Sequence, residues 1–412
     1  MPIKTLPIAE QWQCAGCARC CRGSLIWLEA DDLQKLSQQK WDEHPEYRGR
    51  PVVLREGWLS GRMRLAQRED GRCVFLQDDG RCRIHVEFGA DAKPLACRMF
   101  PLQLVPHERH AVLTLRRSCP TAAADQGPPI SDYAKSVGNL VREGGLLDGP
   151  FQPPPLTRSR RGSWLELQAV AGSLDRLVAD TRFPLVRRLA HALRFCDLLD
   201  ECRLSRLDTG RLRDLCRVLE EPAMQVGELF AERAAPSASA RVLFRQTAAE
   251  YLRVHPGFVV RSGLRARWRL GRMAIGMARG RGSVPRDNWD FPETTFEALE
   301  RPLGHLSEAL QRPWLRFYTA QTGSYQYAVA SRPGWPIVDS FRALALAYPV
   351  SLWVLRWITT DEPPEPSHVI DLISMIDRGQ GFAPLNARTF RVRVQTLTRL
   401  GELTRLLAWY AR

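Results

Sequence analysis

The feature that most constrains this chain is a dense set of cysteines near its start. Eight of the eleven cysteines fall within the first 119 of 412 residues, and four of them stand within eight consecutive positions. These eight are Cys14, Cys17, Cys20, Cys21, Cys73, Cys82, Cys97 and Cys119. The N-terminus has no apolar run followed by a small-residue cleavage site, which indicates a cytoplasmic protein with reduced thiols. A disulfide framework is therefore not expected.

Chance placement of small side chains in a core also fails to explain residues 14–21. The residues between these cysteines are Ala, Gly, Ala and Arg, without helical or strand periodicity. A Cys-x-x-Cys pair lets two thiolates converge on one ion while the intervening amides donate hydrogen bonds to the sulfurs. The eight cysteines are therefore predicted to bind metal, either as iron–sulfur clusters of the 4Fe-4S kind or as zinc, with iron preferred. Eight thiolates suit two centres of either type.

The spacing also bears on the number of centres. Neighbouring side chains diverge, so Cys20 and Cys21 are expected to serve two sites, unless the backbone turns there or one of them is a spare. A regular hairpin over Asp79-Gly80 would pair residue 77 with 82 and residue 75 with 84. Cys73 and Cys82 would then lie about 13 Å apart on one face, too far to share one zinc ion. A regular hairpin predicts two centres, and a single centre requires an irregular one.

The order of these motifs resembles a known family. Residues 14–21 follow the pattern Cys-x-x-Cys-x-x-Cys-Cys, and the later matches are Cys73-x-Phe75, Cys82-x-Ile84-His85 and Lys93-Pro94-x-x-Cys97-Arg98-x-Phe100-Pro101. Residues 11–125 are thus similar to the CxxCxxCC family of zinc- or iron-chelating domains, also described as iron-sulfur-cluster-containing proteins. In that family an aromatic residue, usually Tyr, tends to stand at the position of His85, so an additional ligand there is an open question. Cys119-Pro120 resembles the last cysteine of the pattern.

Apolar patterning divides the chain into a cysteine-rich front and a helical remainder. Short strands are expected at 24–28, 62–66 and 110–117, with one convincing helix at 28–39. Pro-rich stretches bracket a short helix at 131–145. The predicted fold class is α+β, with a small metal-binding domain at 1–127, a connector at 128–155 and a larger helical domain at 156–412. A front with so little periodicity would owe part of its folding energy to the metal.

Beyond residue 155, apolar residues recur at helical spacing almost throughout. Helices are expected across 167–178, 184–202, 212–219, 240–253, 303–330, 337–358, 367–377 and 387–410. Cys196, Cys202 and Cys216 lie on apolar stripes, so they are expected to be buried thiols rather than ligands. The longest apolar stretch, 343–358, contains Pro349 and Arg356 and is shorter than the roughly 20 residues that a bilayer requires. A buried helix without membrane insertion is expected there.

The net charge of +14 comes almost entirely from arginine. Arginine codon preference in a GC-rich genome explains this as well as a polyanionic partner does. The most basic tract runs from Arg261 to Arg286, without an acidic residue and with Trp268 inside it. It suits contact with phosphates or an acidic protein surface, and the alternative is a solvated helix face followed by a Gly-rich loop.

Familiar catalytic motifs are missing from the sequence. It contains no nucleophile elbow, no phosphate-binding loop ending in Gly-Lys-Ser/Thr and no His-Glu-x-x-His. The chain is also similar in length and layout to flagellin lysine-N-methylases, which look like longer CxxCxxCC proteins with a mostly helical remainder. That resemblance implies S-adenosylmethionine as methyl donor and a protein substrate such as flagellin.

Three hypotheses follow. The preferred one is a cytoplasmic iron-sulfur or zinc protein of the CxxCxxCC family, whose cluster is structural or redox-active. The second is a protein lysine N-methylase that uses S-adenosylmethionine. The third is a zinc-stapled nucleic-acid-binding protein that uses the arginine tract.

Overall fold

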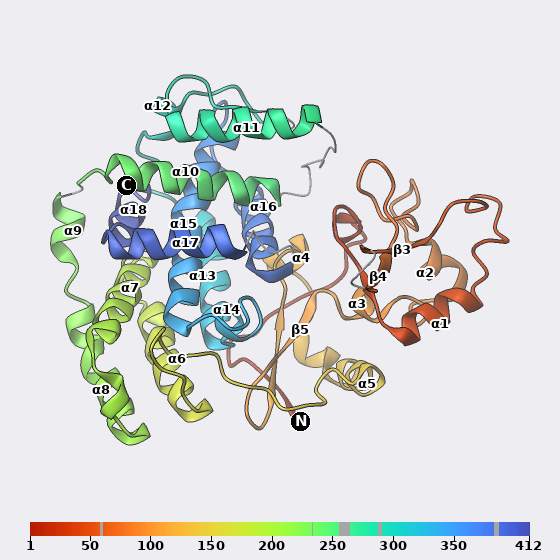
Figure 1. Cartoon of the computed structure of the whole chain (residues 1–412), viewed down its shortest axis with the longest axis horizontal. Coiled ribbons are helices and arrows are strands. Elements are labelled where there is room, and N and C mark those ends of the chain that lie inside the picture. Colours follow the sequence, from red (N-terminus) through yellow and green to blue (C-terminus); the bar gives the residue numbers. More distant parts are fainter. Residues whose placement is uncertain (58–60, 233, 255–263, 287–290, 383–386) are drawn as a thin grey trace.

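The computed structural model describes residues 1–57, 61–232, 234–254, 264–286, 291–382 and 387–412. Within them, a front of short strands and helices lies beside a larger helical body (Figure 1). The α+β class expected from the sequence is therefore confirmed. The two boundaries between the three predicted segments remain predictions.

Six short strands form two sheets in the described residues. They are β1 (Ile3–Thr5), β2 (Trp27–Leu28), β3 (Val53–Arg55), β4 (Met63–Leu65), β5 (Leu102–Pro106) and β6 (Ala111–Leu115). One sheet has the order β1-β6-β5, with β1 parallel to β6 and β5 antiparallel to it. The other has the order β2-β4-β3 and is antiparallel throughout. The strands expected at 24–28, 62–66 and 110–117 are thus present in shorter form.

Short helices complete the front. They are η1 (Arg19–Cys21), α1 (Ala30–Gln38), α2 (Arg83–Phe88), α3 (Leu95–Met99), α4 (Pro120–Ala124), η2 (Ile130–Tyr133) and α5 (Ala134–Gly144). The helix expected at 28–39 is α1, which begins with a capping box between Glu29 and Asp32. Asp32 also accepts a hydrogen bond from the amide of Leu95 at 2.8 Å, which ties α1 to the start of α3.

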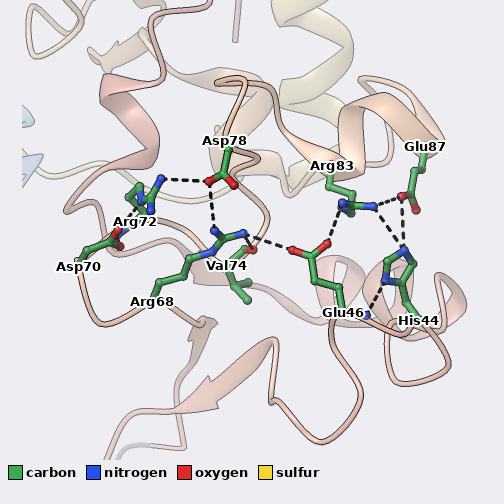
Figure 2. A network of polar contacts seen from close by, with 9 residues as sticks. All are labelled: His44, Glu46, Arg68, Asp70, Arg72, Val74, Asp78, Arg83 and Glu87. Carbon is green, nitrogen blue, oxygen red and sulfur yellow. Dashed lines mark hydrogen bonds and ion pairs between the residues drawn. The ribbon is translucent and has the colours of Figure 1, made fainter.

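The sheet β2-β4-β3 has a core of only seven buried side chains. They are Leu28, Leu36, Trp41, Tyr47, Leu65, Phe75 and Ile84. A network of ion pairs joins Arg68 and Arg83 to carboxylates in the same part of the front (Figure 2). In it Arg83 contacts Glu46 at 2.7 Å and Glu87 at 3.0 Å. Much of the surrounding structure is therefore polar rather than apolar.

The helical body contains the remaining helices of the described chain. They are α6 (Trp164–Ala179), α7 (Leu185–Glu201), η3 (Leu204–Arg206), α8 (Thr209–Ala223), α9 (Gly227–Glu232), α10 (Ala238–Arg253), α11 (Leu264–Arg279), α12 (Phe296–Leu299), α13 (Glu308–Gly323), α14 (Gln326–Val329), α15 (Ile337–Ile358), α16 (Pro366–Asp377), η4 (Arg378–Phe382), α17 (Ala387–Arg399) and α18 (Leu403–Tyr410). Most were expected from apolar spacing.

The central helix of this body is α15, which is buried from Ile337 to Trp357. It is the one helix of the described residues that is long and apolar enough to cross a membrane, but its apolar window is entirely buried inside the protein. The expectation of a buried helix is confirmed. Arg356, which interrupts its apolar sequence, donates hydrogen bonds to the carbonyls of Arg301 and Tyr410, both at 2.7 Å.

Two long helices expected from the sequence are each broken in the structure. The first, 303–330, divides into α13 and α14 because Tyr325 has a left-handed backbone with φ +59°. The second, 387–410, divides into α17 and α18 at Gly401, where φ is +66°. A left-handed residue cannot continue a right-handed helix, although the apolar periodicity continues across both breaks.

The three cysteines of the helical body behave as expected from their apolar positions. Cys196 and Cys216 are buried, and Cys202 is half-buried. Burial raises the pKa of Cys216 to about 12. These thiols are therefore suited to packing rather than to reactivity.

Candidate metal centre

The cysteine-rich loop, residues 14–23, is laid along a second segment of the front. The amide of Cys73 donates to the carbonyl of Cys21 at 2.8 Å, and the amide of Gly23 donates to the carbonyl of Gly71 at 2.9 Å. Ala18 adopts a left-handed conformation with φ +56° and begins the short helix η1. This turned backbone is unfavourable for alanine, so contacts around the loop must hold it in place.

The turn brings two neighbouring thiols together. The sulfurs of Cys20 and Cys21 lie 3.9 Å apart. The expectation that these side chains diverge is therefore wrong, because η1 replaces the extended backbone that would separate them. Two sulfurs that each lie about 2.3 Å from one ion can be this close, so the pair is able to share a site.

Of the two alternatives left open for the turn over Asp79-Gly80, the structure has the irregular one. Leu76, not residue 77, bridges to Cys82, and the amide of Leu76 turns back to the carbonyl of Cys73 at 3.0 Å. Cys82 then stands at the N-cap of α2, where an extended second strand would have continued. The chain around Cys73 and Cys82 is thus irregular, which is the condition that a single centre required.

Four thiols from separate segments influence one another's pKa. Cys20, Cys73, Cys82 and Cys97 come from η1, the irregular turn, the start of α2 and α3. Burial raises the pKa of Cys73 to about 11, with further contributions from Cys82 and Cys20. Burial also raises the pKa of Cys97, to which Cys73, Cys82 and Cys20 all contribute. The contact with Cys21 is the largest cause that raises the pKa of Cys20.

The donor set fits a soft metal with several positive charges. Thiolates packed this closely repel one another, and a bound cation removes that penalty. Within the described residues, no three Cys, His, Asp or Glu side chains already stand close enough to hold a single ion. The four thiols therefore influence one another without forming a closed ligand set in this part of the chain.

The remaining predicted ligands lie elsewhere. Cys14 and Cys17 are exposed in the cysteine-rich loop. Cys119 is buried at the N-cap of α4, where its sulfur lies 3.1 Å from the hydroxyl of Thr121. Burial raises the pKa of Cys119, and contacts with Thr121 and Trp12 oppose that change. His85 is exposed on α2.

Sequence reasoning missed the charged residues that hold the loop against the helical body. Arg19 forms an ion pair with Asp371 of α16. Arg378 of η4 donates to the carbonyl of Arg22 at 3.1 Å and to the hydroxyl of Ser24 at 2.8 Å. These partners are more than 350 residues apart, so no local motif could have indicated them.

One buried carboxylate joins the same two parts of the molecule. Asp377 at the end of α16 accepts a hydrogen bond from Arg116 Nε at 3.0 Å and another from the amide of Ser118 at 2.8 Å. The residue is fully buried. The stretch just before Cys119 is therefore fixed to the helical body.

Comparison with known proteins supports the assignment of the front. Residues 13–120 match the model of the CxxCxxCC family, described as "Putative zinc- or iron-chelating domain". The resemblance drawn from the motifs is therefore confirmed for this part of the chain.

An uncharacterized protein of Methanocaldococcus jannaschii is 31% identical to this chain over 111 residues. That match covers 26% of this chain and 36% of the relative, so the chain spans well under half of the relative's length. No solved structure matches the chain.

Proposed function

We propose that the front of this chain binds a cysteine-ligated iron–sulfur cluster of the 4Fe-4S kind, with Cys20, Cys73, Cys82 and Cys97 as its ligands. The observation that carries this proposal is the convergence of those four thiols from four separate segments. The eight front cysteines supply the four thiolates that each of two such clusters requires. Zinc is the alternative. When bound, the metal supplies the positive charge that stabilises four adjacent thiolates.

Two cations of the chain itself support the same site. Lys93 and Arg378 each interact favourably with a thiolate at Cys20. Lys93 interacts in the same way with Cys97. Their charges offset the excess negative charge of four thiolates, and Arg378 also fixes the end of the cysteine-rich loop through Arg22 and Ser24.

The other four cysteines are proposed as ligands of a second centre. Trp12 packs against the apolar cluster that contains Cys119, and Cys14 follows Trp12 by two residues, which is a reach of roughly 7 Å. Cys17 and Cys21 complete the set. Cys21 lies beside Cys20, so it also has access to the first centre.

Metal and sulfide analysis of protein purified without oxygen tests both centres. We expect a brown protein that absorbs near about 400 nm, bleaches with dithionite and contains about four iron and four sulfide per centre. Cys97→Ala is expected to remove the first centre and Cys119→Ala the second, whereas the control Cys202→Ala retains both. A colourless protein with stoichiometric zinc supports the alternative. A natively folded chain without iron or zinc rejects the proposal.

A second function, protein lysine methylation with S-adenosylmethionine as donor, is supported by a buried cation. Arg332 is only 6% exposed. Its Nε and Nη2 have no hydrogen-bond partner, and no carboxylate pairs with it in the described residues. Its guanidinium lies 4.4 Å from the Phe390 ring and 5.0 Å from the Trp335 ring. A buried cation without a counter-ion is unfavourable, and the carboxylate of the donor would supply one.

The surroundings of Arg332 connect it to the metal region. Tyr251 interacts with Arg332, and Gln380 donates a hydrogen bond to the hydroxyl of Tyr251 at 2.9 Å. Gln380 belongs to η4, as does Arg378, which holds the cysteine-rich loop. A donor bound at Arg332 would therefore lie one short segment away from the proposed cluster.

Equilibrium dialysis with labelled S-adenosylmethionine tests this second function. Saturable binding is expected, together with methyl transfer to lysines of flagellin. Arg332→Gln and Arg332→Lys should weaken donor binding by about tenfold while the iron content stays unchanged. The iron content serves as the check on folding. Absence of saturable binding to the iron-loaded chain rejects the methylase function and leaves the metal proposal intact.

A further inference from the structure

Helix α11 carries an apolar stripe on its outer face. Leu264 is 83% exposed, Trp268 66% and Ile275 54%. At 100° per residue these three side chains point within about 40° of one another. Isolated exposed apolar residues are common on proteins, but three of this size aligned on one helix form a continuous apolar surface.

The opposite face of the same helix is already occupied. Met273 and Met277 are buried, at about 180° from the stripe, and α11 packs there against α10. Arg245 of α10 donates to the carbonyls of Met277 at 2.8 Å and Ala278 at 3.2 Å. Figure 1 shows α11 at the edge of the molecule, outside α10. The stripe is therefore anchored from behind and faces outward.

Arginines flank the stripe. Arg269, Arg272 and Arg279 are exposed, and α11 contains no acidic residue. The guanidinium of Arg272 lies 5.1 Å from the Trp268 ring, and none of these three arginines forms an ion pair within the described part of the chain. Their charges remain available to a partner.

The rest of the arginine tract is less available. Arg286 is paired with Glu293, so this end of the tract is already neutralised. Arg261 lies outside the described residues, as do the side chains of Arg265 and Arg267. The basic surface that the structure places thus consists of the arginines of α11 and Arg281 just after it.

We propose that α11 is an interfacial helix through which the protein rests on an anionic lipid bilayer. Leu264, Trp268 and Ile275 would enter the boundary between headgroups and acyl chains, and the flanking arginines would contact acidic headgroups. Because the inner face is packed on α10, the helix lies flat on the surface and does not cross the bilayer. This inference is independent of the proposed metal centre.

Charge and shape decide between this partner and the others. A second copy of the chain would bring arginine rows of the same sign together, in a molecule with a net charge of +14. A nucleic acid that docked on α11 would contact the apolar stripe at the centre and the arginines only at the side. Phosphate binding requires the arginines at the centre of the contact. A lipid interface accommodates the apolar stripe among the acyl chains and the arginines beside it among the headgroups.

Co-sedimentation of the full-length protein with vesicles tests the proposal. We expect binding to vesicles of phosphatidylcholine and phosphatidylserine in a two-to-one ratio, and little binding to phosphatidylcholine alone. The double variant Arg272→Gln, Arg279→Gln should weaken binding about 25-fold, since each arginine near such a surface contributes about fivefold. The double variant Trp268→Ser, Ile275→Ser should weaken it at least tenfold.

The control is Val218→Ser, which alters an equally exposed apolar residue, 68% exposed, on α8. It should leave vesicle binding unchanged. Equal binding to neutral and anionic vesicles, or unchanged binding by both double variants, overturns the proposal. The proposal is also overturned if the protein does not bind vesicles but forms a salt-sensitive complex with single-stranded DNA that the same variants abolish. A dimer that Trp268→Ser dissociates would instead assign the stripe to a second copy.

Discussion

The front and the helical body of this molecule are stabilised in different ways. The helical body has an apolar core built around α15, in which every side chain from Ile337 to Trp357 is buried. The part of the front around the sheet β2-β4-β3 has seven buried apolar side chains, a nearby network of ion pairs and four thiols that influence one another. We therefore expect apolar burial to be sufficient for the helical body, and the region around β2-β4-β3 to need an additional source of folding energy.

The junction between the two parts shows how they depend on each other. Asp377 and Arg378, at the end of α16 and the start of η4, both reach into the front. A well-packed helical body thus presents fixed charged groups to a region with little core of its own. We infer that the body positions the cysteine-rich loop and the metal then fixes its conformation.

Removal of the metal should have the largest effect on this comparison. A structural cysteine-bound metal contributes on the order of 10 kcal/mol to folding, which is comparable to the net stability of a typical domain. After anaerobic chelation, amides of residues 14–100 should lose hydrogen-exchange protection, while α15 and its neighbours keep theirs. The quadruple variant of Cys20, Cys73, Cys82 and Cys97 to Ser should give the same pattern.

The same hydrogen-exchange measurement can also contradict a structural role of the metal in the front. Cys202→Ala is the matched control, because it removes a half-buried thiol from the helical body. If chelated protein exchanges as slowly in the front as metal-loaded protein does, the ion pairs and the small core are sufficient and the metal is not structural.

The junction should give the next largest effect. Asp377→Asn removes a fully buried charge that accepts hydrogen bonds from Arg116 and Ser118, and loss of one partner of a buried ion pair costs about 3 kcal/mol or more. Urea denaturation should then show the front unfolding before the body. Asp371→Asn breaks the half-exposed pair with Arg19 and should cost less than about 1 kcal/mol. Equal effects of the two substitutions would argue against a buried junction.

A titrating histidine at the same junction should have a smaller effect. His107 packs against His110 at 4.9 Å and faces the carbonyl of Ser324, and burial, with His110 and Lys4 nearby, lowers its pKa to about 4. The unfolded chain, with a histidine pKa near 6.5, binds this proton first as the pH falls. The contribution of His107 to the free energy of unfolding should be fully present above pH 6.5. It should decrease by roughly 2 to 3 kcal/mol towards pH 4 and change no further at lower pH.

Comparison with His107→Gln isolates this contribution from carboxylates that titrate in the same range. The measurement is the free energy of unfolding in urea between about pH 7 and pH 4 for both proteins. The difference between the two curves should change between pH 6.5 and pH 4, where the unfolded chain binds the proton of this histidine before the folded protein does. Parallel curves would mean that the pKa of His107 is the same in the folded and the unfolded protein.

Prediction from sequence succeeded where one local pattern decides the outcome. The similarity of residues 13–120 to the CxxCxxCC family was recognised from the spacing of the front cysteines, and α15 was recognised from its long apolar stretch. The strands at β4 and β6 follow from the same kind of local signal.

Prediction failed where the backbone turns without a strong local signal. The left-handed conformation of Ala18 brings Cys20 and Cys21 together, and the irregular turn after Cys73 replaces a hairpin. Left-handed Tyr325 divides a helix whose apolar spacing does not change. The charged contacts of Arg378 and Asp371 with the loop depend on tertiary structure alone. Such contacts override local preference because they form only in the assembled fold.

The ion-pair network of the front should give the smallest effect. Arg83→Gln removes the contacts with Glu46 and Glu87, but its side chain is 21% exposed and both acceptors are more so. Such pairs are partly screened by water, so the loss should be less than about 1 kcal/mol and should shrink in about 1 M salt. Chemical denaturation of metal-loaded protein measures it, with Arg81→Gln, which breaks an exposed pair with Asp79, as the control. A salt-sensitive loss of about 3 kcal/mol at Arg83 would mean that charge pairing rather than metal holds the front, since a screened pair cannot contribute that much unless its network acts as a unit.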